Sequence, residues 1–240
     1  MAAIAAPPVE VPRPRPVAPA WHTLALVALF LIVAAGGAYF QSRASAHPAI
    51  AERHAGVLPL YGSLIILEWG LLYYIWKGGL RRTGTALSEL IGERWGHGRD
   101  VLADAAWAGA LWAAWMLLLL GWRRWLAPGA AASVESMLPR SGLETVLWIV
   151  LSVSAGVCEE LVFRGYFQRQ FHALTGRRWV AVVLQSLLFG ISHGYQGAVA
   201  CLKIALYGAM FGAFALWRRS LRPGMIAHAW TDIATGLLFR

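Results

Sequence analysis

Long runs of apolar residues, separated by shorter polar connections, dominate the sequence. Most of these runs approach 20 residues, the length with which an α-helix crosses the roughly 30 Å hydrocarbon core of a bilayer at about 1.5 Å of rise per residue. We therefore predict an all-α fold, namely a polytopic transmembrane helical bundle of about seven spans. The predicted spans cover residues 23–40, 57–76, 103–122, 143–168, 179–196, 199–217 and 223–239.

The same pattern divides the chain into three segments. Residues 1–20 are rich in proline and alanine, which predicts a flexible N-terminal tail. Residues 21–142 hold the N-terminal spans, and apolar residues that recur at helical spacing among charges near 86–97 predict an interfacial amphipathic helix there. Residues 143–239 form a C-terminal membrane core. The Ala-Ser-Ala sequence at 44–46 resembles a signal-peptidase site, so removal of the preceding segment is an alternative.

The composition agrees with a membrane environment, since 58% of the residues are hydrophobic and only 14% are charged. Many of the 13 tryptophans lie at the edges of runs, where an amphipathic ring suits the headgroup level. A net charge of +9 does not indicate a nucleic-acid partner, because the basic residues lie between the runs and form no stripe with interleaved aromatic residues. Alternate connections carry 13 Lys and Arg on the side of the N-terminus and seven on the other, which predicts a cytoplasmic N-terminus.

Cys158 and Cys201 each lie inside an apolar run, so the sequence offers neither a disulfide framework nor a metal–thiolate site. Gly208 and Gly212 have the small-xxx-small spacing that permits close approach of membrane helices. We expect packing to be a sufficient reason for that pair.

The fourth run contains two adjacent carboxylates, Glu159 and Glu160, and the cation Arg164. Charged groups in the middle of a span cost about 2.5 to 3.5 kcal/mol on insertion scales, so they normally face a protein interior or a wet cavity. Glu160 and Arg164 are four residues apart and can pair on one helix face. Glu159 points about 100° away on an α-helix and remains available for another role.

Two further runs carry ionisable groups. His193 lies in the fifth run, and His228 and Asp232 lie four residues apart in the seventh. A carboxylate, two histidines and a further acidic group can together activate a water molecule and stabilise an oxyanion. Taken singly, an ion pair can simply join two helices and a histidine can be a satisfied core residue. Their joint occurrence in the C-terminal half predicts one shared polar cavity between the fourth, fifth and seventh spans.

These three motifs together resemble those of the CAAX protease and bacteriocin-processing family of intramembrane glutamic endopeptidases. The family's Glu-Glu-x-x-x-Arg motif matches Glu159, Glu160 and Arg164, its Phe-x-x-x-His motif matches Phe189 and His193, and its His-x-x-x-Asn motif begins at His228. The resemblance covers about residues 143–239. Three short motifs in order on three successive polar-bearing spans make it specific.

The resemblance implies an intramembrane endopeptidase that hydrolyses a peptide bond of a membrane-associated protein or peptide, without a cofactor. It implies that Glu159 and His193 activate the attacking water, that His228 and the last residue of the third motif stabilise the oxyanion, and that Glu160 and Arg164 support this geometry. With the charge count, it implies a multi-pass protein of the cell membrane, and in a bacterium of the inner membrane.

Asp232 departs from the family's usual asparagine. An ionised aspartate can only accept hydrogen bonds, whereas an asparagine amide can also donate one. Either Asp232 is protonated, or it accepts the ring N–H of His228 and leaves the other ring nitrogen for the substrate.

Other functions stay open at this level. Glu159, His193 and His228 could ligate zinc as two histidines and one carboxylate, although the HExxH helix signature is absent. A non-catalytic membrane protein, either a bacteriocin-immunity binder or a proton-coupled carrier, could use the same residues, although the sequence lacks the internal repeat common in carriers. Prenylated tails, bacteriocin leaders, anchored regulatory proteins and sorting tails are all open as substrates.

Overall fold

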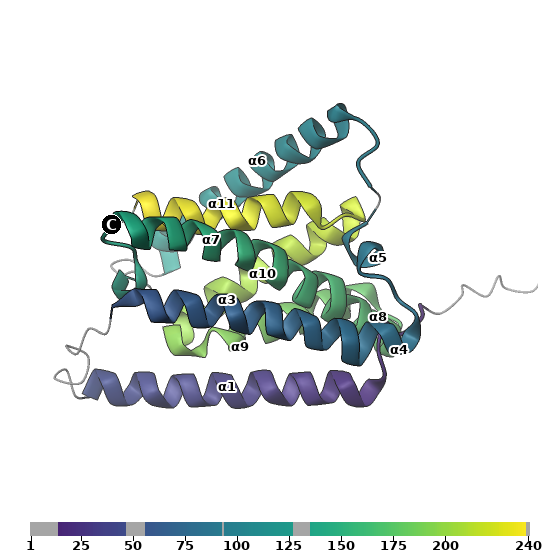
Figure 1. Cartoon of the computed structure of the whole chain (residues 1–240), viewed down its shortest axis with the longest axis horizontal. Helices are drawn as coiled ribbons and strands as arrows, with labels where there is room; N and C mark the ends of the chain where they lie inside the picture. Colours follow the sequence, from purple (N-terminus) through teal and green to yellow (C-terminus); the bar gives the residue numbers. More distant parts are fainter. Residues whose placement is uncertain (1–13, 47–55, 93, 127–134, 239–240) are drawn as a thin grey trace, which may run out of the picture.

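The structure is a computed structural model that describes residues 14–46, 56–92, 94–126 and 135–238. Over these ranges every regular element is a helix (Figure 1). The longer helices are α1 (Ala20–Ala46), α3 (Val57–Tyr74), α6 (Gly98–Gly121), α7 (Gly142–Glu159), α8 (Gln168–Thr175), α9 (Arg178–Ser192), α10 (Ala198–Arg218) and α11 (Arg222–Leu238). The shorter elements are η1 (Ile75–Leu80), α4 (Arg81–Thr83), α5 (Leu87–Ile91), η2 (Trp122–Leu126), η3 (Glu135–Met137), η4 (Glu160–Phe167) and η5 (Gly194–Gln196).

The predicted helical membrane bundle is confirmed. Five helical segments are long and apolar enough to cross a bilayer, and they coincide with the first, second, third, fourth and sixth predicted spans. The other two predicted spans correspond to α9 and α11, which have 15 and 17 residues and are short for a full crossing. The chain is therefore a multi-pass membrane protein. The cytoplasmic location of its N-terminus stays a prediction.

The fourth predicted span is part of a much longer helix. α7, η4 and α8 follow one another without a break from Gly142 to Thr175, which makes 34 residues and about 51 Å at 1.5 Å per residue. The middle section, η4, is wound as a π-helix and begins at Glu160. Widened turns of this kind are frequent at functional sites in membrane and soluble helices. The first polar motif thus lies where the longest helix changes its winding.

Small residues let the C-terminal helices approach closely. A methyl group at Gly156 of α7 would lie 2.8 Å from the Ala229 backbone nitrogen and 2.8 Å from the Met225 carbonyl oxygen of α11. At Gly208 a methyl group would lie 3.0 Å from Ser186 of α9, so the small-xxx-small spacing in α10 does serve helix packing. The contact at Gly156 is the one that draws α11 against the helix that carries the glutamates.

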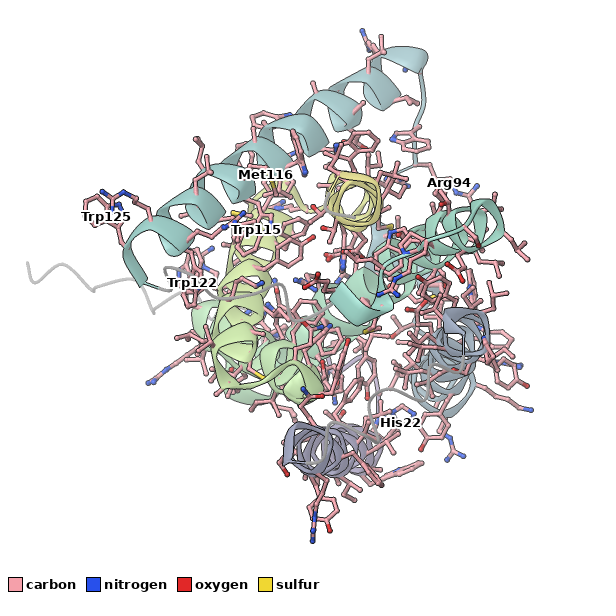
Figure 2. All side chains as sticks on the ribbon, turned by 90° about the vertical axis from the view of Figure 1, so that its left-hand side faces the viewer. His22, Arg94, Trp115, Met116, Trp122 and Trp125 are labelled. Carbon is pink, nitrogen blue, oxygen red and sulfur yellow. The ribbon has the colours of Figure 1, made fainter. Side chains whose placement is uncertain are left out.

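Aromatic side chains occupy both the surface and the interior of the bundle. Trp125 is exposed at the end of the α6 segment, and Trp115 is buried and packs edge-on against Tyr207 of α10 with ring centroids 4.9 Å apart (Figure 2). Exposed tryptophans at helix ends agree with an interfacial belt. The belt interpretation therefore fits Trp125 but does not extend to Trp115.

The structure adds detail at the boundaries of two predicted segments. Val17 and Ala18 are buried, and their backbone N–H groups donate to Gln170 Oε1 at 2.9 and 3.2 Å, so the end of the predicted flexible tail is fixed to α8. The rest of that tail, residues 1–13, lies outside the described residues. The amphipathic helix predicted near 86–97 is confined to α5, because Gly92 adopts φ 103° and ends it.

Candidate active site

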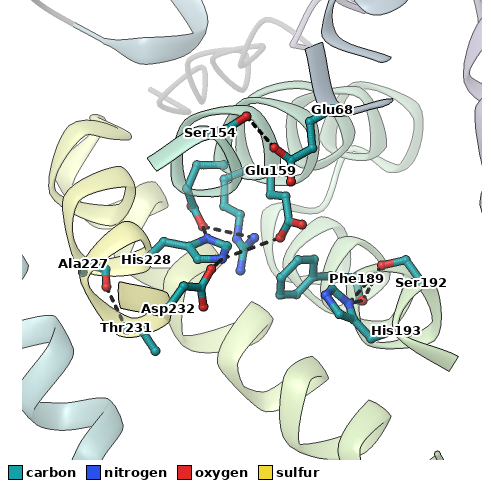
Figure 3. Close-up of polar contacts among 12 residues, drawn as sticks. Glu68, Ser154, Glu159, Phe189, Ser192, His193, Ala227, His228, Thr231 and Asp232 are labelled. Carbon is teal, nitrogen blue, oxygen red and sulfur yellow. Dashed lines mark hydrogen bonds and ion pairs between the residues drawn. The ribbon is translucent and has the colours of Figure 1, made fainter. Parts of the chain in front are cut away.

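His228 is the centre of the polar cluster that the sequence predicts. Its Nδ1 lies 3.0 Å from Glu160 Oε1, and its Nε2 lies 3.6 Å from Glu159 Oε2 and 3.6 Å from Asp232 Oδ2 (Figure 3). The imidazole side chain is 6% exposed. One buried ring therefore contacts three carboxylates that come from two helices.

The environments of the three carboxylates differ. The Glu160 side chain is 1% exposed, whereas those of Glu159 and Asp232 are 24% and 36% exposed. The Nε2 side of His228 is thus the accessible side of the cluster, and the Nδ1 side is closed. A small molecule such as water can thus approach the ring on the side of Glu159 and Asp232.

Arg164 neutralises Glu160 within the protein interior. Its Nη1 lies 3.2 Å from Glu160 Oε1, and both side chains are essentially inaccessible. The guanidinium carbon lies 4.4 Å from the centroid of the Phe189 ring and within 6.0 Å of those of Tyr207 and Phe211. Cation–π contacts of this kind stabilise a desolvated cation. The predicted pair is present, but Glu160 has a second partner, since it also accepts a hydrogen bond from His228.

His193 stands apart from this contact network. It lies at the end of α9 rather than inside a span, and its Nδ1 is 2.9 Å from the Phe189 carbonyl oxygen. A carbonyl can only accept, so Nδ1 carries the proton and Nε2 is left as an acceptor. The Phe189 ring lies between the two histidines, with centroids 5.0 Å from His193 and 6.2 Å from His228.

Of the six residues predicted from the sequence, five form one contact network, and the sixth, His193, adjoins it through Phe189. In the view of Figure 3 the Glu159 carboxylate projects between the rings of His193 and His228. In the described part of the chain no three His, Cys, Asp or Glu side chains are arranged to hold a metal ion. The zinc set considered above, Glu159 with both histidines, is therefore not assembled in this geometry.

The position of Asp232 bears on its two predicted roles. Asp232 faces Nε2 of His228, and Glu160 already occupies Nδ1. The arrangement in which Asp232 orients the ring and leaves the other nitrogen for the substrate does not fit, because that other nitrogen is closed off. Glu160 is the carboxylate that contacts Nδ1 of the ring.

The sequence analysis missed Glu68 of α3. Ser154 Oγ donates to Glu68 Oε2 at 2.5 Å, and Glu68 lies close enough to Glu159, His228 and Asp232 to interact with them electrostatically (Figure 3). A carboxylate inside the apolar run 57–76 has the same desolvation cost as the two glutamates of the fourth run. That cost was a sufficient signal to include Glu68 among the candidates.

Comparison with known proteins identifies the segment that carries this cluster. Residues 141–234 match a family model described as "Type II CAAX prenyl endopeptidase Rce1-like". Neither a search of curated proteins nor a search of solved structures returns a match. The matched segment contains all six predicted site residues and excludes Glu68.

Proposed function

Through residues 141–234 the chain belongs to the CAAX protease family, and on this premise we propose that it hydrolyses a peptide bond of a membrane-associated substrate with a water molecule activated by Glu159. The observation that carries the proposal is the surrounding of His228 by Glu160 on its closed side and by Glu159 and Asp232 on its accessible side. Desolvated ionisable groups of this density are costly in a membrane helix, which favours a chemical role over a packing role.

Glu159 acts as the general base in this proposal. A water molecule on the accessible side of His228 donates a hydrogen bond to the Glu159 carboxylate, which takes its proton as the oxygen attacks the substrate carbonyl carbon. When the tetrahedral intermediate collapses and the C–N bond breaks, the protonated Glu159 returns that proton to the leaving amine. The products are a carboxylate and an amine, and no covalent enzyme intermediate forms.

His228 stabilises the oxyanion. Its Nδ1–H donates to Glu160, which fixes the orientation of the ring in the way that a buried carboxylate orients other catalytic histidines. With carboxylates on both sides, a doubly protonated ring has an acceptor for each N–H group. The Nε2–H group then donates to the oxyanion that develops beside Glu159 and Asp232.

His193 and Asp232 complete the proposal. The unprotonated Nε2 of His193 serves as a second acceptor for the attacking water, on the opposite side of the Glu159 carboxylate from His228. Asp232 limits the space at Nε2 of His228 and contributes to the placement of the oxyanion. Arg164 balances the charge of Glu160 and contacts no reacting atom.

The test compares cells that produce the parent protein with cells that produce Glu159→Gln at the same level. Quantitative proteomics of isolated membranes should show at least one membrane-associated protein that accumulates uncut in the variant, and the shortened product should appear in the parent alone. The purified parent should then cleave that precursor in vesicles while Glu159→Gln does not. Equal cleavage by both purified proteins would refute the glutamic mechanism, and the absence of any cleavage by the parent would refute the protease.

A further inference from the structure

A basic cavity lies at the end of the bundle where α4, α5 and α8 meet, on the right in Figure 1. Its volume is about 640 Å³, and its wall combines the segment before α1, the turn after α4, α8, and the connection between α10 and α11. Apart from Arg164, which pairs with Glu160, its charged and titratable lining consists of Arg15, Arg169, His172, Arg178, Arg219 and Glu89. Four guanidinium groups therefore line this cavity together with a single carboxylate.

In the lining of this cavity the negative charge comes from Glu89, which interacts electrostatically with Arg169. Within the described ranges, none of the four arginines forms an ion pair with a carboxylate. Arg169 donates from Nη2 to the Leu90 carbonyl at 3.3 Å, and Glu89 Oε1 accepts from its own helix, from the Ala86 N–H at 2.8 Å. The positive charge that gathers at this cavity is thus left for an external anion.

The backbone of Arg219 gives independent support. Arg219 ends α10 with φ 54°, and it is the one residue other than glycine with positive φ in the described part of the chain. Glycine is the usual residue at such a position, and a side chain there is strained. Strain of this kind is an indicator of function when the side chain serves a purpose. Here the strain places a cation at this cavity and at a second one of about 830 Å³, which Arg94, Arg169 and Arg218 also line.

The N-terminus of α9 adds to the positive potential of the same cavity. Arg178 is the first residue of this 15-residue helix, which has no side-chain cap and no acidic residue in its first turn. The free N–H groups and the dipole of a helix N-terminus favour an anion. The N-terminus of α9 and the arginine side chains thus both favour an anion in this cavity.

We propose that this cavity binds the phosphate group of an anionic membrane lipid. The cavity lies at the ends of membrane-spanning helices, on the side with the excess of Lys and Arg, and basic pockets between helices at that depth suit lipid phosphates. Several planar guanidinium groups also match a phosphate, with its charge and several oxygen atoms, better than they match a single carboxylate. This inference does not depend on the proposed function.

The test uses the purified full-length protein in a neutral detergent. Phosphatidylglycerol is titrated in, phosphatidylcholine serves as the neutral reference, and retained lipid is counted by native mass spectrometry. The parent should retain phosphatidylglycerol in a saturable manner and phosphatidylcholine weakly. The double variant Arg178→Gln, Arg219→Gln should bind phosphatidylglycerol about 25-fold more weakly, at about five-fold for each cation removed.

The matched control is the variant Arg123→Gln, Arg124→Gln. It removes two cations from η2, which follows the C-terminal end of α6 and does not line this cavity. It should bind phosphatidylglycerol as the parent does. Equal weakening in both double variants, or binding that does not saturate, would mean that general surface charge attracts the lipid, and the proposal would be overturned.

Three further arms complete the design. Arg219→Gly removes the backbone strain together with the cation, so it should melt no lower than the parent in neutral detergent yet bind phosphatidylglycerol about five-fold more weakly. Unchanged binding by Arg219→Gly would contradict the role given to Arg219.

Inorganic phosphate alone at millimolar concentration should stabilise the parent little. If it stabilises the parent strongly and the Arg178, Arg219 double variant not at all, free phosphate rather than lipid is the ligand. Glu159→Gln should bind lipid normally, which separates this inference from the proteolytic mechanism.

Discussion

Replacing Glu160 by glutamine should destabilise the protein, whereas the same change at its neighbour Glu159 should not. Glu160→Gln leaves the Arg164 cation without its carboxylate at a position where both side chains are essentially inaccessible. Removal of one partner from a buried ion pair typically costs 3 to 5 kcal/mol. The aromatic rings around Arg164 recover part of this, about 2 kcal/mol for a desolvated cation. We therefore expect a loss of about 1 to 3 kcal/mol in the free energy of unfolding.

The second arm of this experiment removes both charges. In Glu160→Gln, Arg164→Met no uncompensated cation remains, and methionine fills similar space between the aromatic rings. Most of the lost stability should return, although activity should not, because the His228 ring has lost its charged acceptor. Glu159→Gln is the matched control, since Glu159 is adjacent on the same helix, is partly exposed and does not pair with Arg164.

The assay is reversible unfolding in mixed micelles, followed by circular dichroism. The parent, Glu160→Gln, Arg164→Met and the double variant are compared as a double-mutant cycle, and Glu159→Gln is measured beside them. The cycle should give a coupling of at least 1 kcal/mol between positions 160 and 164. If Glu160→Gln unfolds within 0.5 kcal/mol of the parent, or if the double variant is less stable than the single one, Arg164 is not held by Glu160 and the assignment of this pair is wrong.

Three further predictions concern the same site. Glu159→Gln should reduce turnover by about 10²- to 10⁴-fold or more in a cleavage assay with purified protein, at unchanged stability, because glutamine cannot accept the proton; a parent-like rate would exclude Glu159 as the base. Asp232→Asn should keep activity within about ten-fold of the parent, because its carbonyl still accepts at Nε2 of His228 and its amide can donate toward the oxyanion; a loss beyond a hundred-fold would mean that the carboxylate itself is required. Gly156→Ala should lower the free energy of unfolding by about 1 to 3 kcal/mol, since its methyl group would lie 2.8 Å from α11 backbone atoms; an equally stable and active variant would show that the two helices need no such contact.

The sequence predicted the class of fold, and it predicted polar side chains that the structure brings together in one cluster, because both features depend on desolvation. Apolar runs of span length and ionisable groups inside them are visible without any knowledge of packing. The same reasoning, applied to every run, would also have included Glu68. The order of the motifs then linked the polar groups to a family, and the match over residues 141–234 confirms that link.

What the sequence could not supply is geometry that depends on contacts between helices. The closure of the Nδ1 side of His228 depends on how closely α7 and α11 approach at Gly156, and no spacing within one helix reports that distance. The end of α9 at Ser192 likewise moves His193 out of the span in which the apolar pattern placed it. For α5, a positive φ at Gly92 ended a helix whose apolar spacing continued to Trp95.

The two adjacent glutamates have different environments because successive side chains of a helix point in different directions, about 100° apart in an α-helix, and Glu159 and Glu160 lie where α7 passes into the π-helix η4. This difference in direction places Glu160 against Arg164 and the closed side of His228, while Glu159 faces the accessible side, where 24% of its side chain is exposed. Two carboxylates with the same chemistry then suit opposite tasks. A base that must exchange a proton with water has to be reachable, and a residue that fixes the orientation of a ring is most effective when water cannot compete for it. In the proposed mechanism, two adjacent positions of one helix thus supply a base and the residue that supports it, provided that α11 lies close enough for a single histidine to contact both.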